Sequence, residues 1–137
     1  MRRSVAALAL TTALVPFPGG GAQASGNSVG TVAGGVNLLP MEEVVVPIIE
    51  ADRIAGNMRV KLVIEASSVE ALSRAVAGMP KLREATVATA LEFARLNASG
   101  MRAVDAGRLD HDLNAALRAV EPGVSRALIV EIAASRS

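Results

Sequence analysis

The sequence predicts an α+β fold in which helices pack on one face of a small antiparallel or mixed sheet, in the order β-β-α-α-α-β. Two observations carry this prediction. Residues 44–51 are β-branched and apolar, and residues 58–66 alternate between apolar and polar side chains, which is the period of a half-buried strand. Residues 67–120 instead repeat their apolar side chains at helical spacing, and a short apolar run follows them near the C-terminus.

The first two strands are expected to form a β-hairpin. The run VVVPIIEA, residues 44–51, is β-branched and apolar, and Pro47 within it cannot donate to a ladder, which indicates an edge strand or a bulge. After the turn-forming stretch DRIAGN, residues 52–57, the run MRVKLVIEA alternates strictly. One side of it carries Val60, Leu62 and Ile64, and the other carries Arg59, Lys61, Val63 and Glu65.

Three helices should follow. Ser67 and Glu70 fit a capping box that opens a short helix ending near Gly78. Pro80 suits the first turn of a second helix, which Asn97 and Gly100 end. The third helix should begin at the N-cap Asp105 and end at Val120. Its expected apolar face consists of Leu109, Leu113, Ala116, Leu117 and Val120.

A closing strand is predicted in VSRALIVEIA, residues 124–133. Strict alternation places Leu128, Val130 and Ile132 on one of its faces. Ile129 and Glu131 then lie on the other face. Because the run is short, apolar and late in the chain, we expect it in the middle of the sheet.

The N-terminus has the three parts of a secretory signal peptide. Arg2 and Arg3 precede an apolar run from Val5 to Val15, and AQA follows two prolines. We therefore expect residues 1–24 to be a signal peptide cleaved after Ala24, with a short uncleaved anchor as the alternative. Residues 25–40 should be a flexible linker, because glycine, serine and asparagine dominate them without a regular period. Residues 41–137 should form the folded domain, exported to the periplasm.

Composition argues against several functions. The net charge is +1 and the only aromatic residues are two phenylalanines, so neither a basic stripe nor a stacking platform for nucleic acid is expected. The chain contains no cysteine, which excludes disulfides, thiolate metal ligands and a cysteine nucleophile.

The only histidine, His111, lies between Asp110 and Asp112. On a helix these side chains are about 100° apart, so the three do not converge on one ion. Glycine and alanine occupy positions 107 and 115, so His111 has no ligand partner one turn away. We predict a solvated helix face here, with no catalytic, cofactor-binding or metal site, no small-molecule substrate and no enzymatic activity.

The candidate interface consists of Pro47, Arg59 and Lys61. Pro47 marks an edge strand with unpaired backbone groups, and the two cations lie on the predicted outer face of the next strand. Such a surface could serve self-association or contact with a protein partner.

The segments LLPMEEVVVPIIE, MRVKLVIEAS, MPKLREATVATALEFA, DAGRLDHDLNAALRAV and VSRALIVEI together resemble the periplasmic domain of the flagellar basal-body family FliL, itself similar to stomatin-type domains. The resemblance covers about residues 40–137. Two segments match the family's patterns by their place in the chain. MPKLR, residues 79–83, lies where the family has the start of a helix, and ALIVE, residues 127–131, lies in the last strand.

The resemblance implies a non-enzymatic accessory of the motor stator that supports motility and assembles as a homo-oligomer. It also implies inner-membrane association where the leader stays uncleaved. The alternative is a periplasmic adaptor or binding module of another envelope complex.

Overall fold

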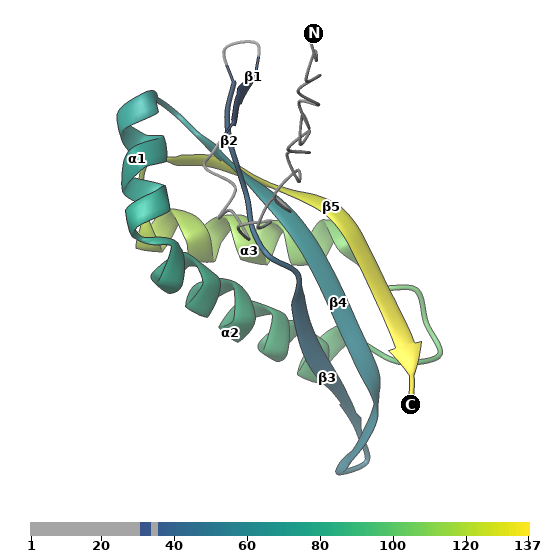
Figure 1. Cartoon of the computed structure of the whole chain (residues 1–137). Helices are drawn as coiled ribbons and strands as arrows, with labels where there is room; N and C mark the ends of the chain where they lie inside the picture. The colour runs from purple at the N-terminus through teal and green to yellow at the C-terminus, as the bar shows by residue number, and fades with distance from the viewer. Residues whose placement is uncertain (1–30, 34–35) are drawn as a thin grey trace, which may run out of the picture.

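The computed structural model describes residues 31–33 and 36–137, which form an α+β fold with a single sheet and a single layer of helices (Figure 1). In chain order the elements are β1 (Thr31–Ala33), β2 (Val36–Pro40), β3 (Val44–Glu50), β4 (Arg53–Ala66), α1 (Val69–Ala77), α2 (Met79–Asn97), α3 (Ala106–Val120) and β5 (Val124–Arg136).

Strand β4 is the centre of the sheet, and every pairing is antiparallel. Along one of its edges β4 pairs with β2 and then with β3, from Pro40 opposite Val63 to Val44 opposite Val60. Strands β2 and β3 therefore lie end to end beside β4. β5 pairs with the other edge of β4, and β1 pairs with the far side of β2. The sheet is thus three strands wide over most of its length.

Two expectations about the sheet were wrong. Strands β1 and β2 precede the predicted hairpin, so the order is β-β-β-β-α-α-α-β. β5 lies at an edge and not in the middle, because β2 and β3 already fill one side of β4 and the described chain supplies no strand beyond β5.

The flexible linker expected over residues 25–40 is also corrected in part. Residues 31–33 and 36–40 are strands, and the side chain of Leu39 in β2 is only 2% exposed. The run VNLLP is too short to show a period by itself, and its pairing with β4 makes it a strand. The expected signal peptide and its cleavage after Ala24 lie outside the described residues.

The β3–β4 hairpin forms as predicted, but its loop is shorter than expected. β4 begins at Arg53, so Ala51 and Asp52 alone make the turn. Their φ angles are 48° and 61°, the left-handed pair that a two-residue turn needs to match the strand twist. Neither residue is glycine, so Ala51 holds a conformation that its Cβ disfavours.

The helices begin close to the expected residues. Ser68, and not Ser67, is the N-cap of α1, and its Oγ accepts a hydrogen bond of 3.0 Å from the Ala71 amide. Asp105 is the N-cap of α3 as predicted, accepting from the Arg108 amide at 3.0 Å. The last predicted residue of that helix, Val120, is confirmed as its end but is exposed.

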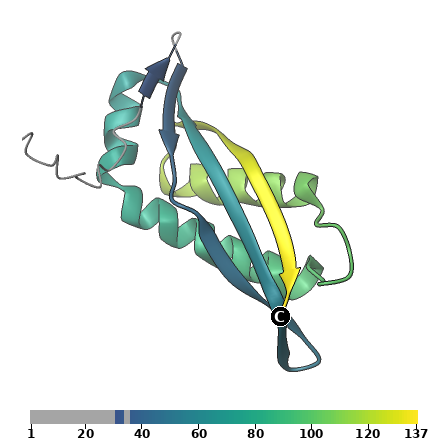
Figure 2. The ribbon, with the colours of Figure 1, turned by 45° about the vertical axis from the view of Figure 1, so that its right-hand side comes forward.

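All three helices pack on the same face of the sheet (Figures 1 and 2). α2 lies against β3, and α3 lies against β5. The side chains of β4 that meet this layer are at most 2% exposed, and they are Met58, Val60, Leu62 and Ile64. The alternation predicted for β4 is therefore confirmed.

The alternation predicted for β5 is wrong because the strand is bulged. Its register against β4 shifts between Lys61 and Leu62, so that Val130 is passed over. Ile129 and Ile132 then both pack against the core, while Val130 is 67% exposed. One extra residue thus moves the remainder of the strand to the opposite face.

Side chains of α3 bond to the backbone of β5 near its start. The carboxamide of the buried Asn114 accepts from the Ala127 amide at 2.8 Å and donates to the Ala127 carbonyl at 3.2 Å. The guanidinium of Arg118 donates to the Ser125 carbonyl at 2.8 Å. Asn114 therefore forms the two backbone hydrogen bonds at Ala127 that a neighbouring strand would otherwise form.

Replacing Ala51 by asparagine should stabilise the hairpin. Asparagine tolerates positive φ better than alanine and its side chain remains exposed, so we expect a gain of about 0.5–1 kcal/mol in the free energy of unfolding. Urea denaturation measures it. The control is Ala51→Val, whose β-branched side chain should lower the free energy of unfolding instead. An Ala51→Asn variant that is no more stable than wild type would contradict the strained turn.

Replacing Asn114 by alanine should destabilise the fold by about 1–3 kcal/mol, because the Ala127 amide and carbonyl lose their partner where the surroundings are buried. Thermal and urea unfolding measure the loss. Arg118→Ala is the matched comparison and should cost less, because its exposed bonds to Ser125 can be replaced by water. Equal losses would contradict the role given to Asn114.

Candidate functional site

The face of the sheet opposite the helices is the candidate site, and we call it the outer sheet face. Within the described part of the chain, no helix packs on it (Figure 2). The register of the strands sets its members, since directly opposed residues share a face. They are Leu38, Pro40, Glu43, Val45, Pro47, Ile49, Ile54, Asn57, Arg59, Lys61, Val63, Glu65, Arg126, Leu128, Glu131, Ala133 and Ser135.

Lys61 lies at the middle of this face between two carboxylates. Its Nζ is 3.0 Å from Glu131 on β5 and 3.6 Å from Glu43 at the start of β3. The hydrogen bond to Glu131 and the charges of both carboxylates raise the pKa of Lys61, so the amine stays protonated. These three residues form what we call the Lys61 triad, whose net charge is −1.

Arg59 lies two residues before Lys61 on β4, in a different environment. The register places Val45 and Ala133 opposite it on the two neighbouring strands. Among the described residues, no carboxylate oxygen lies within 4.0 Å of its guanidinium. A net positive row therefore lies directly beside the net negative row of the Lys61 triad.

Apolar side chains extend the outer sheet face toward the hairpin tip. Val45, Ile49 and Ile54 are 54%, 48% and 63% exposed, and the register pairs Ile49 with Ile54. Pro47 lies between Val45 and Ile49 on β3, at an edge of the sheet, and the extra residue where the register shifts is Ala55 on β4. Of the two alternatives predicted for the strand of Pro47, the edge position is confirmed, whereas the bulge lies on β4.

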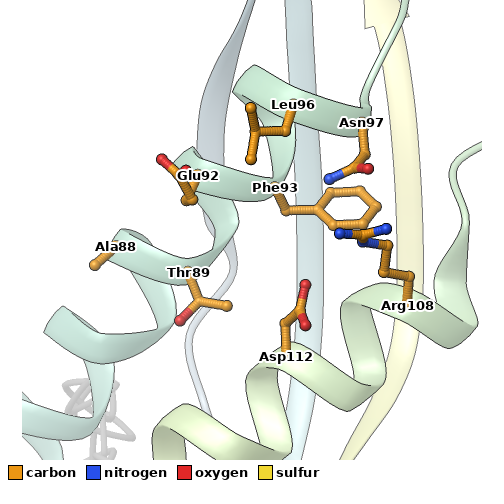
Figure 3. A pocket seen from close by; sticks show the side chains of 8 residues that line it. All are labelled: Ala88, Thr89, Glu92, Phe93, Leu96, Asn97, Arg108 and Asp112. Carbon is orange, nitrogen blue, oxygen red and sulfur yellow. The ribbon is translucent and has the colours of Figure 1, made fainter.

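A shallow groove lies between α2 and α3. Its volume is about 340 Å³, and Figure 3 shows its lining side chains. The buried ring of Phe93 forms the apolar part, with the carboxylate of Asp112 and the guanidinium of Arg108 across from α2. The residues that line it are Ala88, Thr89, Glu92, Phe93, Leu96, Asn97, Arg108 and Asp112.

His111 lies on the exposed side of α3 as the sequence analysis expected. Arg108 and Asp112 both face the groove, and no nitrogen–oxygen distance within 4.0 Å joins them in residues 31–33 and 36–137. Those residues also contain no group of three histidine, aspartate or glutamate side chains placed to hold a metal ion.

The sequence pattern indicated Arg59 and Lys61 but did not show the two carboxylate partners of Lys61. Glu43 directly precedes β3 and Glu131 lies on β5, so their approach to Lys61 depends on how these strands pair with β4. The sequence did contain an indication for Glu131, because its charge is opposite to that of Lys61 and it lies on a strand expected in the same sheet. The bulge at Val130 prevents a count by simple alternation from aligning the two.

The chain matches no protein-family model, and no curated protein matches it. In the described ranges, no helix is both long and apolar enough to cross a membrane.

Glu50, at the tip end of β3, links the hairpin to the loop between α2 and α3. Its carboxylate accepts from the Gly100 amide at 3.1 Å. Hydrogen bonds from the Ser99 side chain and from that amide, together with the charges of Arg136 and Arg53, lower the pKa of Glu50 below 4.5. This contact fixes one end of the sheet against the helix layer.

Replacing Glu50 by glutamine should remove a pH-dependent part of stability. A carboxyl group with a lowered pKa stabilises the fold above its unfolded pKa of 4.5, and this contribution is lost as pH falls through the folded value. The difference in stability between wild type and Glu50→Gln should therefore be larger at neutral pH than in acid. Urea unfolding at both conditions measures it, and a difference that grows in acid contradicts the assignment.

Proposed function

We propose that this chain is a non-enzymatic accessory protein that binds protein partners on its outer sheet face. The observation that carries the proposal is the uncovered face itself, which combines exposed apolar side chains with Arg59 and the Lys61 triad. Apolar contact area beside a polar, charged arrangement is what a protein–protein interface requires.

The place proposed for this activity is the flagellar basal body, with the motor stator as partner. The resemblance of residues 40–137 to the FliL family supports it. The basic and apolar leader supports export to the periplasm, with inner-membrane association where the leader is uncleaved. An adaptor role in another envelope complex is the alternative, and it uses the same face with a different partner.

Photo-crosslinking in cells tests both the surface and the partner. A photoreactive amino acid replaces Asn57 or Val45 on the outer sheet face in one set of strains. In the matched control it replaces the exposed Glu84 of α2 on the helix layer. We expect the outer positions to capture a stator or basal-body protein, identified by mass spectrometry, and the Glu84 position not to capture it.

Loss of function should follow the same surface. Arg59→Glu should reduce motility, whereas Arg102→Glu, in the exposed loop between α2 and α3, should not. Crosslinks confined to the helix layer, or motility unaffected by Arg59→Glu, would contradict the proposal. Capture of a different envelope complex from the outer positions would assign the alternative role.

A further inference from the structure

We infer that the outer sheet face binds a second copy of this chain across a two-fold axis. The axis lies in the plane of the interface and crosses the strands between the row of Arg59 and the row of Lys61. The inference deepens the proposed function, since it rests on the outer sheet face being a protein-binding surface and names one occupant of it.

The first step is the order of charges along the face. The register gives successive rows across β3, β4 and β5. The row of Arg59, with Val45 and Ala133, carries a net charge of +1. The next row is the Lys61 triad, with a net charge of −1. Glu65 and Arg126, 3.4 Å apart, neutralise each other four residues beyond Lys61 along β4. One net positive row and one net negative row are thus adjacent.

The second step is the symmetry of this pattern. A two-fold axis between the two rows places the Arg59 row of each copy over the Lys61 triad of the other. The side chain of Arg59 then approaches Lys61 of the second copy, with the carboxylates of Glu43 and Glu131 on either side, so that a row of net charge +1 meets a triad of net charge −1. Because the operation is symmetric, the same contact forms twice, as an isologous interface requires.

The rows on either side of this charged pair also meet, and together they set the area of the interface. The same axis places Pro47 and Asn57 over the row of Val63, Pro40 and Leu128. A face three strands wide and about 14 residues long offers on the order of 600 Å² per copy. That is near the lower end for specific interfaces, so we expect a concentration-dependent monomer–dimer equilibrium.

Side-chain contacts at the sheet edges favour the face over an edge as the meeting surface. Asn114 and Arg118 already bond to the backbone of β5 at Ala127 and Ser125. On the opposite edge, Arg83 of α2 donates to the carbonyls of Glu42 and Glu43 at 3.0 and 3.3 Å. Pro47 in β3 and the bulges in β5 further interrupt the two edge strands.

Charge reversal tests the inference by sedimentation velocity of the purified chain over a range of concentrations. Arg59→Glu makes both rows negative, and Glu131→Arg makes both rows positive. Each variant alone should show a dimer dissociation constant raised by roughly tenfold or more, because two attractive contacts become repulsive. An equimolar mixture of the two variants should associate again, since each then meets its opposite. The double variant Arg59→Glu/Glu131→Arg should also self-associate.

Arg102→Glu and Glu84→Arg, both exposed and away from this face, are the matched charge controls and should behave as wild type. Circular dichroism confirms that each variant is folded. A wild-type chain that stays monomeric at every concentration overturns the inference, as does a dimer that the reversals leave unchanged. Failure of self-association leaves the proposed function standing if photo-crosslinking from Asn57 still captures an envelope protein, so the two failures are distinguishable.

Discussion

The alternation of side chains along β4 is the constraint on which the rest of this structure depends. Within residues 31–33 and 36–137, β4 is the longest strand and pairs along both edges, and its inward side chains are the middle of the core. Since all described helices lie on that side, the opposite side chains of β4 and its neighbours remain at the surface. The fold therefore creates the outer sheet face as a direct consequence of having one helix layer.

An open sheet of this kind must also protect its edges. The helices do this with polar side chains that form hydrogen bonds to edge backbone groups. Asn114 bonds to the amide and carbonyl of Ala127, and Arg83 donates to two carbonyls just before β3. Bulges and Pro47 interrupt the ladders elsewhere. The same helices thus supply the core and limit strand addition, while the broad face between the edges stays accessible.

Local patterns were enough to predict the α+β class, the β3–β4 hairpin and the three helices. The N-cap of α3 at Asp105 and the two faces of β4 also followed from spacing alone. The errors arose where a neighbour decides the outcome. Residues 36–40 become a strand through pairing with β4, and β5 changes face at Val130 because its register shifts. The Lys61 triad was missed for the same reason, since its members meet only through that register.

The outer sheet face carries a net positive row beside a net negative row, and this order makes it self-complementary in charge. The chain has no cysteine, so single cysteines introduced at Asn57 and Val63 report directly on which surfaces meet. A short bismaleimide linker should join an Asn57→Cys copy to a Val63→Cys copy faster than it joins either variant to itself. A mixture that crosslinks no faster than the separate variants, or only through a cysteine placed at Glu84 on the helix layer, would contradict it.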